Sequence, residues 1–200
     1  MGFVIVIALG LYLLISIGVV AWAVSYAKKH GKSVMKWGCT AAFIMYLIPF
    51  WDWIPTVVAH KYYCSTEAGF WVYKTPDQWK KENPGVMETL VANKVSIQTL
   101  GDNENHTDTQ VLNQRFHWIT EKRNLISYLP IYRWQSQVVD TNNGGVVAHW
   151  VDFSRGKGRD YWKFWMNSES CPDGITNRNS LFRFVDELIK MTDTTKRNNK

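Results

Sequence analysis

The sequence predicts an α+β protein in which an N-terminal two-helix transmembrane hairpin precedes a small antiparallel-sheet domain with flanking helices. Three observations lead to this fold class: long apolar segments near the N-terminus, a clear β-hairpin pattern at 133–154, and an amphipathic helical pattern near the C-terminus. We expect a transmembrane hairpin in residues 1–60, an α+β domain in 61–191 and a disordered polar tail in 192–200.

The first apolar segment, residues 3–27, contains no charged residue. A helix needs about 20 apolar residues to cross a bilayer, so this segment is long enough. A cleaved signal peptide is the alternative, because Ala21 and Ala23 flank Trp22 in the small-x-small pattern of a cleavage site. However, no basic residue precedes the segment, and its apolar run exceeds the roughly 7–15 residues of a signal-peptide core. We therefore interpret it as a retained transmembrane helix.

The second apolar segment, residues 37–59, contains Asp52 and two prolines. A charge and a missing backbone donor are both costly inside a bilayer, so two interpretations remain open. In the first, the helix ends at Phe50 and the next three residues lie at the interface, where the indole rings of Trp51 and Trp53 are favoured. In the second, Asp52 is buried and pairs with a cation or a partner subunit, which would make it a residue for membrane assembly.

The loop between the two segments, residues 28–36, is rich in lysine, whereas no Lys or Arg precedes the first segment. Lysines beside transmembrane segments stay on the cytoplasmic side, so we expect a cytoplasmic loop and both termini outside. In a bacterium, this topology would place the protein in the inner membrane with both termini and the C-terminal domain in the periplasm. The loop lysines are Lys28, Lys29, Lys32 and Lys36.

The net charge of +6 does not indicate nucleic-acid binding. Four of the 23 Lys and Arg residues lie in the loop, and the remaining 19 are balanced by 16 acidic residues in 61–200. A domain so nearly neutral lacks the dense basic surface that binds phosphate backbones. The expected partners are the membrane and another envelope or membrane protein.

Two of the three cysteines, Cys64 and Cys171, lie in the domain that this topology places in an oxidising compartment. We predict that they form a disulfide that ties the start of the domain to a late turn. Cys39 is interpreted as a packing residue of the second apolar segment. Metal binding is the alternative for the pair, but no CxxC motif or nearby histidine pair supports it, so we expect no metal and no cofactor.

Cap residues predict a helix at each end of the outer domain. Thr75 as N-cap, Pro76 at the first helical position and Gln78 as capping-box partner predict a short helix. Ser180 is predicted to cap the last helix. The apolar face of that helix follows helical spacing and comprises Leu181, Phe182, Val185, Leu188 and Ile189.

The region between these helices predicts an antiparallel meander. Strands are expected at 95–100, 111–119, 124–131, 133–140 and 146–154, with a possible addition at 161–166. The Gly-rich turn at 141–145 predicts a hairpin. Because side chains alternate along a strand, Trp134 and Ser136 share one face of the first arm, and Trp150 and Asp152 share one face of the second.

The sequence favours a non-enzymatic protein, without settling the question. It contains no GxSxG, HExxH or P-loop motif. His149, Asp152 and Ser154 are the nearest approach to a catalytic triad, but on a strand His149 points to the opposite face from the other two.

A loop after the hairpin alternates cations with glycines, which predicts a contact site for a phosphate, a carboxylate or an acidic partner surface. A solvated turn is the alternative for this loop. Eleven tryptophans also suggest an interaction surface, although strand pairing and core filling explain most of them. The predicted contact residues are Arg155, Lys157, Arg159, Trp150 and Trp162.

These observations favour a membrane-anchored extracytoplasmic protein-binding factor, either an accessory subunit of a membrane complex or an immunity or exclusion factor. The alternative is an envelope enzyme or a module that binds glycans or anionic lipids. A deep pocket with two carboxylates, such as Asp152 and Asp160, would favour that alternative.

Overall fold

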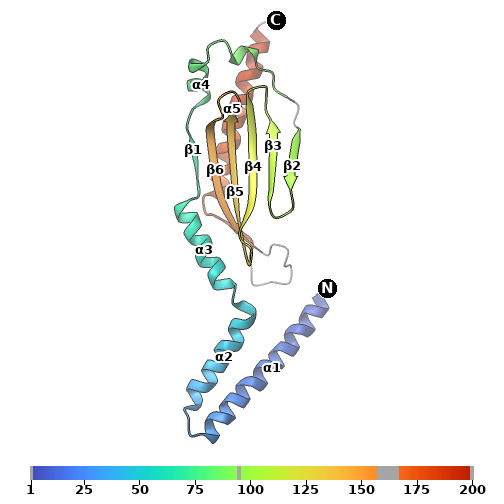
Figure 1. Ribbon diagram of the computed structural model, residues 1–200, viewed down its shortest axis with the longest axis vertical. Helices are drawn as coiled ribbons and strands as arrows, with labels where there is room; N and C mark the ends of the chain where they lie inside the picture. The colour runs from blue at the N-terminus through green and yellow to red at the C-terminus, as the bar shows by residue number, and fades with distance from the viewer. Residues whose placement is uncertain (1, 94–95, 157–166, 199–200) are drawn as a thin grey trace. The chain divides into compact units, whose positions relative to one another are not determined.

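The computed structural model describes residues 2–93, 96–156 and 167–198, and it confirms the α+β class with an apolar helix at the N-terminus. The chain divides into two compact units with a boundary between Pro55 and Thr56. The first unit holds the apolar helices and the second holds the sheet (Figure 1). The strand predicted at 161–166 lies outside the described residues.

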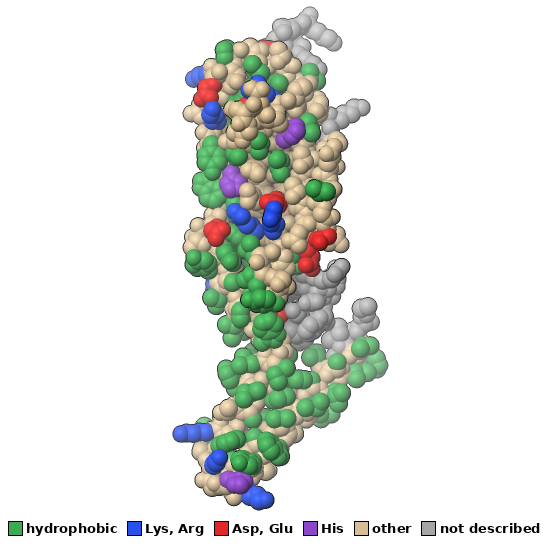
Figure 2. Space-filling view, viewed as in Figure 1, with side chains coloured by type: hydrophobic (Ala, Val, Ile, Leu, Met, Phe, Trp, Pro, Cys, Tyr) green, Lys and Arg blue, Asp and Glu red, His purple; other side chains and the backbone are tan. Residues whose placement is uncertain are grey.

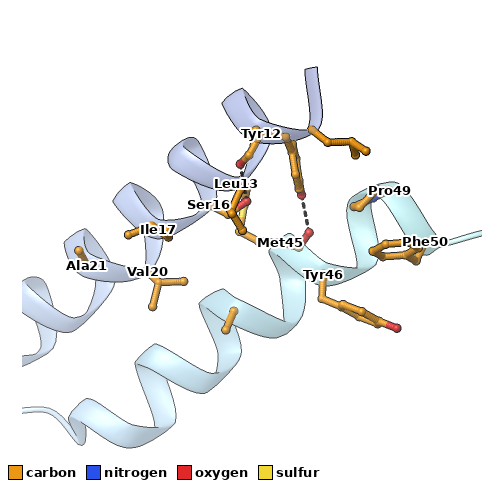
Figure 3. A pocket seen from close by; sticks show the side chains of 13 residues that line it. Tyr12, Leu13, Ser16, Ile17, Val20, Ala21, Met45, Tyr46, Pro49 and Phe50 are labelled. Atoms are coloured by element: carbon orange, nitrogen blue, oxygen red, sulfur yellow. Dashed lines mark hydrogen bonds between the residues drawn. The ribbon is translucent and has the colours of Figure 1, made fainter. Parts of the chain in front are cut away.

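Helices α1 (Gly2–Lys29) and α2 (Val34–Phe50) pack against each other in the first unit. In the turn between them Gly31 has a φ of 62°, which glycine adopts without strain. The hydroxyl of Tyr12 donates a hydrogen bond to the carbonyl of Met45 (Figure 3). These two residues line a largely apolar groove of about 770 Å³ between the helices.

One helix among the described residues, Val6–Lys29 within α1, is long and apolar enough to cross a membrane. The second apolar segment is divided, because α2 ends at Phe50 and helix α3 (Trp53–Thr66) begins after a break. Only together do α2 and α3 reach the length of a span. The structure therefore supports one candidate span and does not confirm a two-helix transmembrane hairpin. Figure 2 shows apolar side chains over much of α1 and α2, with lysines near their turn.

The second unit is built on a seven-stranded antiparallel sheet with the strand order β1-β6-β5-β4-β3-β2, to which β7 adds by pairing with β6. Strands β2 to β6 each pair with their neighbours in sequence, so most of the sheet is the predicted meander. The strands are β1 (Gly69–Val72), β2 (Ile97–Gly101), β3 (His106–Val111), β4 (Phe116–Ile126), β5 (Leu129–Asp140), β6 (Gly145–Arg155) and β7 (Glu169–Ser170).

Strand β4 runs through the charged stretch 121–123, where the sequence predicts a gap between two strands. The expected boundaries at 111–119 and 124–131 were therefore wrong. Contacts across the strands explain the difference: the Lys122 ammonium lies 4.7 Å from the ring centre of Tyr132 and 5.4 Å from that of Trp134. Cross-strand contacts of this kind outweigh weak local strand propensity.

Helix α4 (Pro76–Glu82) is capped as predicted. The backbone N–H of Gln78 donates to the Thr75 hydroxyl at 3.2 Å, and the Thr75 N–H donates to the Gln78 side chain at 3.0 Å. This reciprocal pair is a capping box. It fixes the helix so that Trp79 is buried, and a short 3₁₀ turn, η1 (Met87–Thr89), follows.

The last helix, α5 (Gly174–Asn198), begins well before Ser180, so the predicted cap was wrong. Ser180 lies inside the helix, where its hydroxyl donates to the Thr176 carbonyl at 3.0 Å. The helix continues to Asn198 and includes most of 192–200, the stretch for which the sequence predicts a disordered tail.

Helix α5 lies across one face of the sheet (Figure 1). Its predicted apolar residues Leu181, Val185 and Leu188 are buried, as is Phe184, and they pack against side chains of the central strands and of α4. The buried members of this core are Trp79, Met87, Leu90, Leu112, Phe116, Val138, Val147, Ala148, Trp150, Leu181, Phe184, Val185 and Leu188.

The predicted disulfide between Cys64 and Cys171 is present and spans 107 residues of sequence. It joins α3 to the segment before α5, beside a second small core in which the rings of Tyr63 and Phe153 stack 5.1 Å apart. Closing a loop of about 100 residues removes denatured-chain entropy worth about 5 kcal/mol in the usual treatment. Cys39 is a free, exposed thiol.

A buried carboxylate, Asp140, holds the far end of the hairpin to α4 and β4. Arg115 donates to it from Nε at 2.7 Å, and the indole of Trp79 donates at 2.8 Å. Burial acts to raise the pKa of Asp140, but the hydrogen bonds from Arg115, from Trp79 and from the backbone of Asn142 outweigh it and lower that pKa.

Replacing Asp140 by alanine should lower the free energy of unfolding by about 3 kcal/mol, because the Arg115 and Trp79 donors lose their buried acceptor. Chemical denaturation of the full chain in detergent measures this loss. The matched control is Glu82→Ala, which removes the exposed ion pair of Lys74 and Glu82 at 2.6 Å. That change should cost less than about 1 kcal/mol. Equal losses in the two variants would contradict the account.

The stability that Asp140 contributes should also depend on pH. Because its folded pKa is lowered, this contribution is present above the unfolded pKa of about 4 and is lost as the pH falls through the folded value. The stabilities of the wild type and of Asp140→Ala should therefore approach each other between about pH 5 and pH 2. A difference that stays constant over this range would contradict the assignment.

Candidate functional site

A groove of about 670 Å³ lies between the sheet and the first turns of α5, and it is the strongest candidate site in the described part of the second unit. Its lining is unusually aromatic, with three tryptophans and one phenylalanine. The lining residues are Ile97, Asp108, Trp118, Thr120, Trp134, Ser136, Trp150, Asp152, Ser154, Ser170, Gly174, Ile175, Arg178, Leu181 and Phe182.

The strand register brings the groove floor together. Ser136 of β5 lies opposite Trp150 of β6, and Trp134 lies opposite Asp152 in the next row. On the other side of β5, Ser136 lies opposite Thr120 of β4. Side chains directly opposite on antiparallel strands share one face, so these residues form a continuous surface under α5.

Two of the three groove indoles are held by serine hydroxyls. Trp118 Nε1 donates to Ser136 Oγ at 2.6 Å, and Trp134 Nε1 donates to Ser154 Oγ at 3.0 Å. Trp150 is only 6% exposed, and the described residues offer its N–H no acceptor. The hydroxyls therefore serve mainly to fix the rings, which leaves an aromatic surface with few free polar groups.

The Asp152 carboxylate meets the start of α5 at the end of the groove. It accepts a hydrogen bond from the Cys171 N–H at 3.3 Å. A Cβ atom built on Gly174 would lie 2.5 Å from one carboxylate oxygen, so only glycine fits there. Burial raises the pKa of Asp152, and hydrogen bonds from the backbone of Phe153 and Cys171 partly oppose the shift. Asp152 and the first residue of α5 are therefore in close contact at this end of the groove.

The two carboxylates that line the groove are not arranged for acid–base catalysis. Asp108 is on β3 and Asp152 is on β6, with β4 and β5 between them. Three strand spacings of about 4.8 Å separate the two backbones by roughly 14 Å. Paired carboxylates in glycoside hydrolases lie about 5–9.5 Å apart. Asp108 also accepts a hydrogen bond from the Thr99 hydroxyl at 2.6 Å, so it is already engaged.

The rim of the groove on α5 combines aromatic, aliphatic and cationic groups. The ring of Phe182 meets Trp118 edge to face with centroids 5.5 Å apart. The Arg178 guanidinium lies 5.1 Å from the centre of the Phe182 ring, and Ile175 is 73% exposed. Aromatic and Arg side chains around an apolar floor are typical of the anchor regions of protein interfaces.

The residues predicted as contact sites fall in different places. Trp150 lines the groove, as described above. Arg155 pairs with Glu169, and its side chain is 13% exposed, so its guanidinium is already engaged. Lys157, Arg159 and Trp162, together with Asp160, lie outside the described residues. Asp52 is 1% exposed, as its buried interpretation requires, while its role in assembly remains a prediction.

Sequence reasoning missed most of the groove. It placed Trp134 and Trp150 each on a face of its own strand, but it did not identify Trp118, Phe182 or Arg178 as neighbours. The alternation of side chains along 116–120 could have assigned Trp118 to one face of its strand. Its contact with Phe182 of α5 depends on tertiary packing, which the local pattern does not show. His149 does point away from Asp152: it stacks on Trp71 with ring centres 5.5 Å apart, and burial and the nearby Arg133 lower its pKa.

Comparisons of the chain with protein-family models, with curated proteins and with solved structures find no match. The function is therefore inferred from the groove and from the apolar N-terminal region.

The ionisation of Asp152 should destabilise the domain. The pKa of Asp152 is higher in the folded than in the unfolded protein. Its contribution to the free energy of unfolding is therefore fully present below about pH 4, where the acid is protonated, and is lost as the pH rises through the pKa of the folded state. The wild type should therefore lose stability relative to Asp152→Asn as the pH rises above about 4, as urea unfolding at several pH values would measure. A constant difference between the two proteins would contradict the assignment. Asp77→Asn, an exposed position, is the control.

Proposed function

We propose that the protein is a membrane-anchored, non-enzymatic protein-binding factor whose helix–sheet groove receives apolar side chains of another envelope protein. It would serve as an accessory subunit of a membrane complex or as an immunity or exclusion factor. The observation that carries the proposal is the aromatic groove, in which the polar groups mainly fix the indole rings. A site for catalysis would instead need unengaged acid–base groups close together.

Removal of apolar surface from water is the driving force for this binding. Indole and phenyl rings bury large areas with little loss of side-chain freedom, so a partner side chain that fills the groove gains apolar contact at small entropic cost. Arg178 at the rim can pair with a partner carboxylate and set the orientation. A groove of this size accommodates one or two large side chains, which is the usual size of an interface anchor.

The anchor in this proposal is a hairpin in residues 1–60 across the bacterial inner membrane, in which α1 is one span and the second apolar segment, divided between α2 and α3, is the other. The Lys-rich loop lies in the cytoplasm and the sheet domain in the periplasm. Lys32 lies 4.9 Å from the ring centre of Trp37 and 5.6 Å from that of Tyr26. Aromatic rings with lysine at a helix end are favoured at a membrane surface. The Cys64–Cys171 disulfide is likewise favoured on the oxidising side.

This topology predicts opposite labelling of two introduced cysteines. In a Cys39→Ser background no free thiol remains, because the other two cysteines are bonded to each other. Tyr128→Cys, at an exposed turn of the sheet domain, should react with a membrane-impermeant maleimide on intact bacterial spheroplasts. Lys32→Cys should react only after the membrane is permeabilised. The reverse pattern, or equal labelling of both sites, would contradict the topology.

The groove predicts a position-dependent photo-cross-link. A benzophenone amino acid at Ile175, on the rim, should give one discrete protein adduct in native membranes. The same probe at Arg183, an exposed position of α5 outside the groove lining, should give at least about tenfold less of this adduct. Neither substitution touches the core, so both proteins should fold.

If no adduct forms from Ile175, or if both positions give the same amount, the groove is not the binding site. An adduct that is resistant to protease and sensitive to glycan-cleaving enzymes would favour the second candidate, a glycan-binding module. That candidate has a specific observation in its favour, since the flat indole faces lie beside Thr120, Ser154 and Ser170, and hydroxyl groups of a sugar could bond with these side chains.

A further inference from the structure

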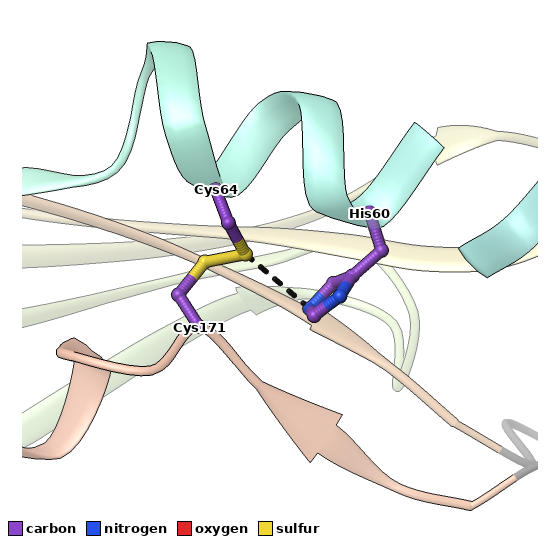
Figure 4. Close-up of side chains that lie close together, drawn as sticks. All are labelled: His60, Cys64 and Cys171. Atoms are coloured by element: carbon purple, nitrogen blue, oxygen red, sulfur yellow. Dashed lines mark hydrogen bonds between the residues drawn. A yellow bond between two sulfur atoms is a disulfide. The ribbon is translucent and has the colours of Figure 1, made fainter. Parts of the chain in front are cut away.

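Three metal-ligating side chains meet beside the second core: His60, Cys64 and Cys171 (Figure 4). His60 and Cys64 are four residues apart on α3, so they project from the same face of the helix. His60 Nε2 lies 3.5 Å from Cys64 Sγ, and the three donor atoms all lie within 4.8 Å of one another. Cys171 approaches from the segment before α5.

A backbone oxygen completes the cluster. The Phe153 carbonyl lies 3.1 Å from His60 Nε2 and 3.5 Å from Cys171 Sγ. Tetrahedral Zn²⁺ with bonds of about 2.0–2.1 Å to nitrogen, 2.3 Å to sulfur and 2.1 Å to oxygen requires edges of about 3.5 Å between N and S, 3.3 Å between N and O, and 3.5 Å between S and O. The three observed separations match these edges to within about 0.3 Å. The two sulfur atoms, 2.02 Å apart in the disulfide, would move apart to about 3.8 Å after reduction.

Contacts other than the disulfide also hold the two segments of the cluster together. Tyr63, next to Cys64, stacks on Phe153, and both residues belong to one apolar cluster with Cys171. His60 is 3% exposed, whereas Cys64 is only partly buried and leaves a route to the cluster.

We propose that, when Cys64 and Cys171 are thiols, these cysteines and His60 form a zinc site, with the Phe153 carbonyl or a water as fourth ligand. The chain is synthesised with both thiols reduced, and binding of Zn²⁺ displaces one proton from each. Once the disulfide has formed, returning to the site needs a dithiol reductant, which gives up two electrons and two protons and becomes a disulfide itself. The metal and the disulfide are thus alternative links between α3 and Cys171.

The proposal is independent of the groove and is tested with metal alone. The full chain, purified in detergent without a polyhistidine tag, is reduced with a phosphine, freed of reductant under anaerobic conditions, and titrated with Co²⁺. We expect one equivalent to bind, with visible bands of tetrahedral cobalt and a near-ultraviolet band from sulfur-to-cobalt charge transfer, and Zn²⁺ should displace it. The oxidised chain should show neither band.

The variants separate a real site from loose thiol binding. His60→Ala should weaken Co²⁺ binding by more than the roughly 10- to 100-fold that the loss of an outer-shell partner costs. His149→Ala, which removes a histidine from another part of the sheet, should bind as the wild type does. Unchanged binding in His60→Ala, or a spectrum without the charge-transfer band, would overturn the proposal.

Folding of the reduced chain provides a second measurement. One equivalent of Zn²⁺ should raise the melting temperature of the reduced wild type and leave that of the oxidised protein unchanged. A reduced chain that loses its β-sheet circular dichroism and does not regain it with Zn²⁺ would overturn the proposal, because the packing would then not hold the ligands in place.

Discussion

The packing of α5 on one face of the sheet is the constraint on which the second unit depends. Phe184, Val185 and Leu188 fill the face at the end where Val138, Ala148 and Phe116 lie. At the other end the helix must begin beside the buried Asp152 carboxylate, and there the strands present indoles and hydroxyls instead of aliphatic side chains. The same helix thus covers the core and borders the aromatic groove, and Trp150 and Leu181 belong to both.

The sequence was sufficient to predict those features of the fold that depend on neighbouring residues or on composition. The capping box of Thr75 and Gln78 needs only neighbouring residues, and the strand period is enough to put Trp134 with Ser136 on one strand face and Trp150 with Asp152 on another. The disulfide was predicted from the compartment that the apolar segments imply, and the structure contains it. None of these features requires knowledge of how distant strands and helices pack.

The features that sequence reasoning missed are those set by distant residues. Strand β4 crosses the charges at 121–123 because Tyr132 and Trp134 of the next strand contact Lys122. Helix α5 begins at Gly174, beside Asp152 of β6, whereas Ser180 is only a local cap signal. The groove needs β4, β5, β6 and α5 together, so no single stretch of sequence displays it. The end of α2 at Phe50 agrees with one of the two interpretations that proline and aspartate left open, whereas the new helix α3 from Trp53 was not predicted.

The central claim is that the groove, carried on a membrane anchor, binds a protein. Native mass spectrometry of the chain purified from its own membranes in mild detergent tests this most directly, with Arg178→Glu at the groove rim compared with Arg183→Glu on the same helix outside it. The account predicts one stoichiometric protein companion that Arg178→Glu releases and Arg183→Glu retains. A chain that always runs alone, or a companion held equally by both variants, would contradict it.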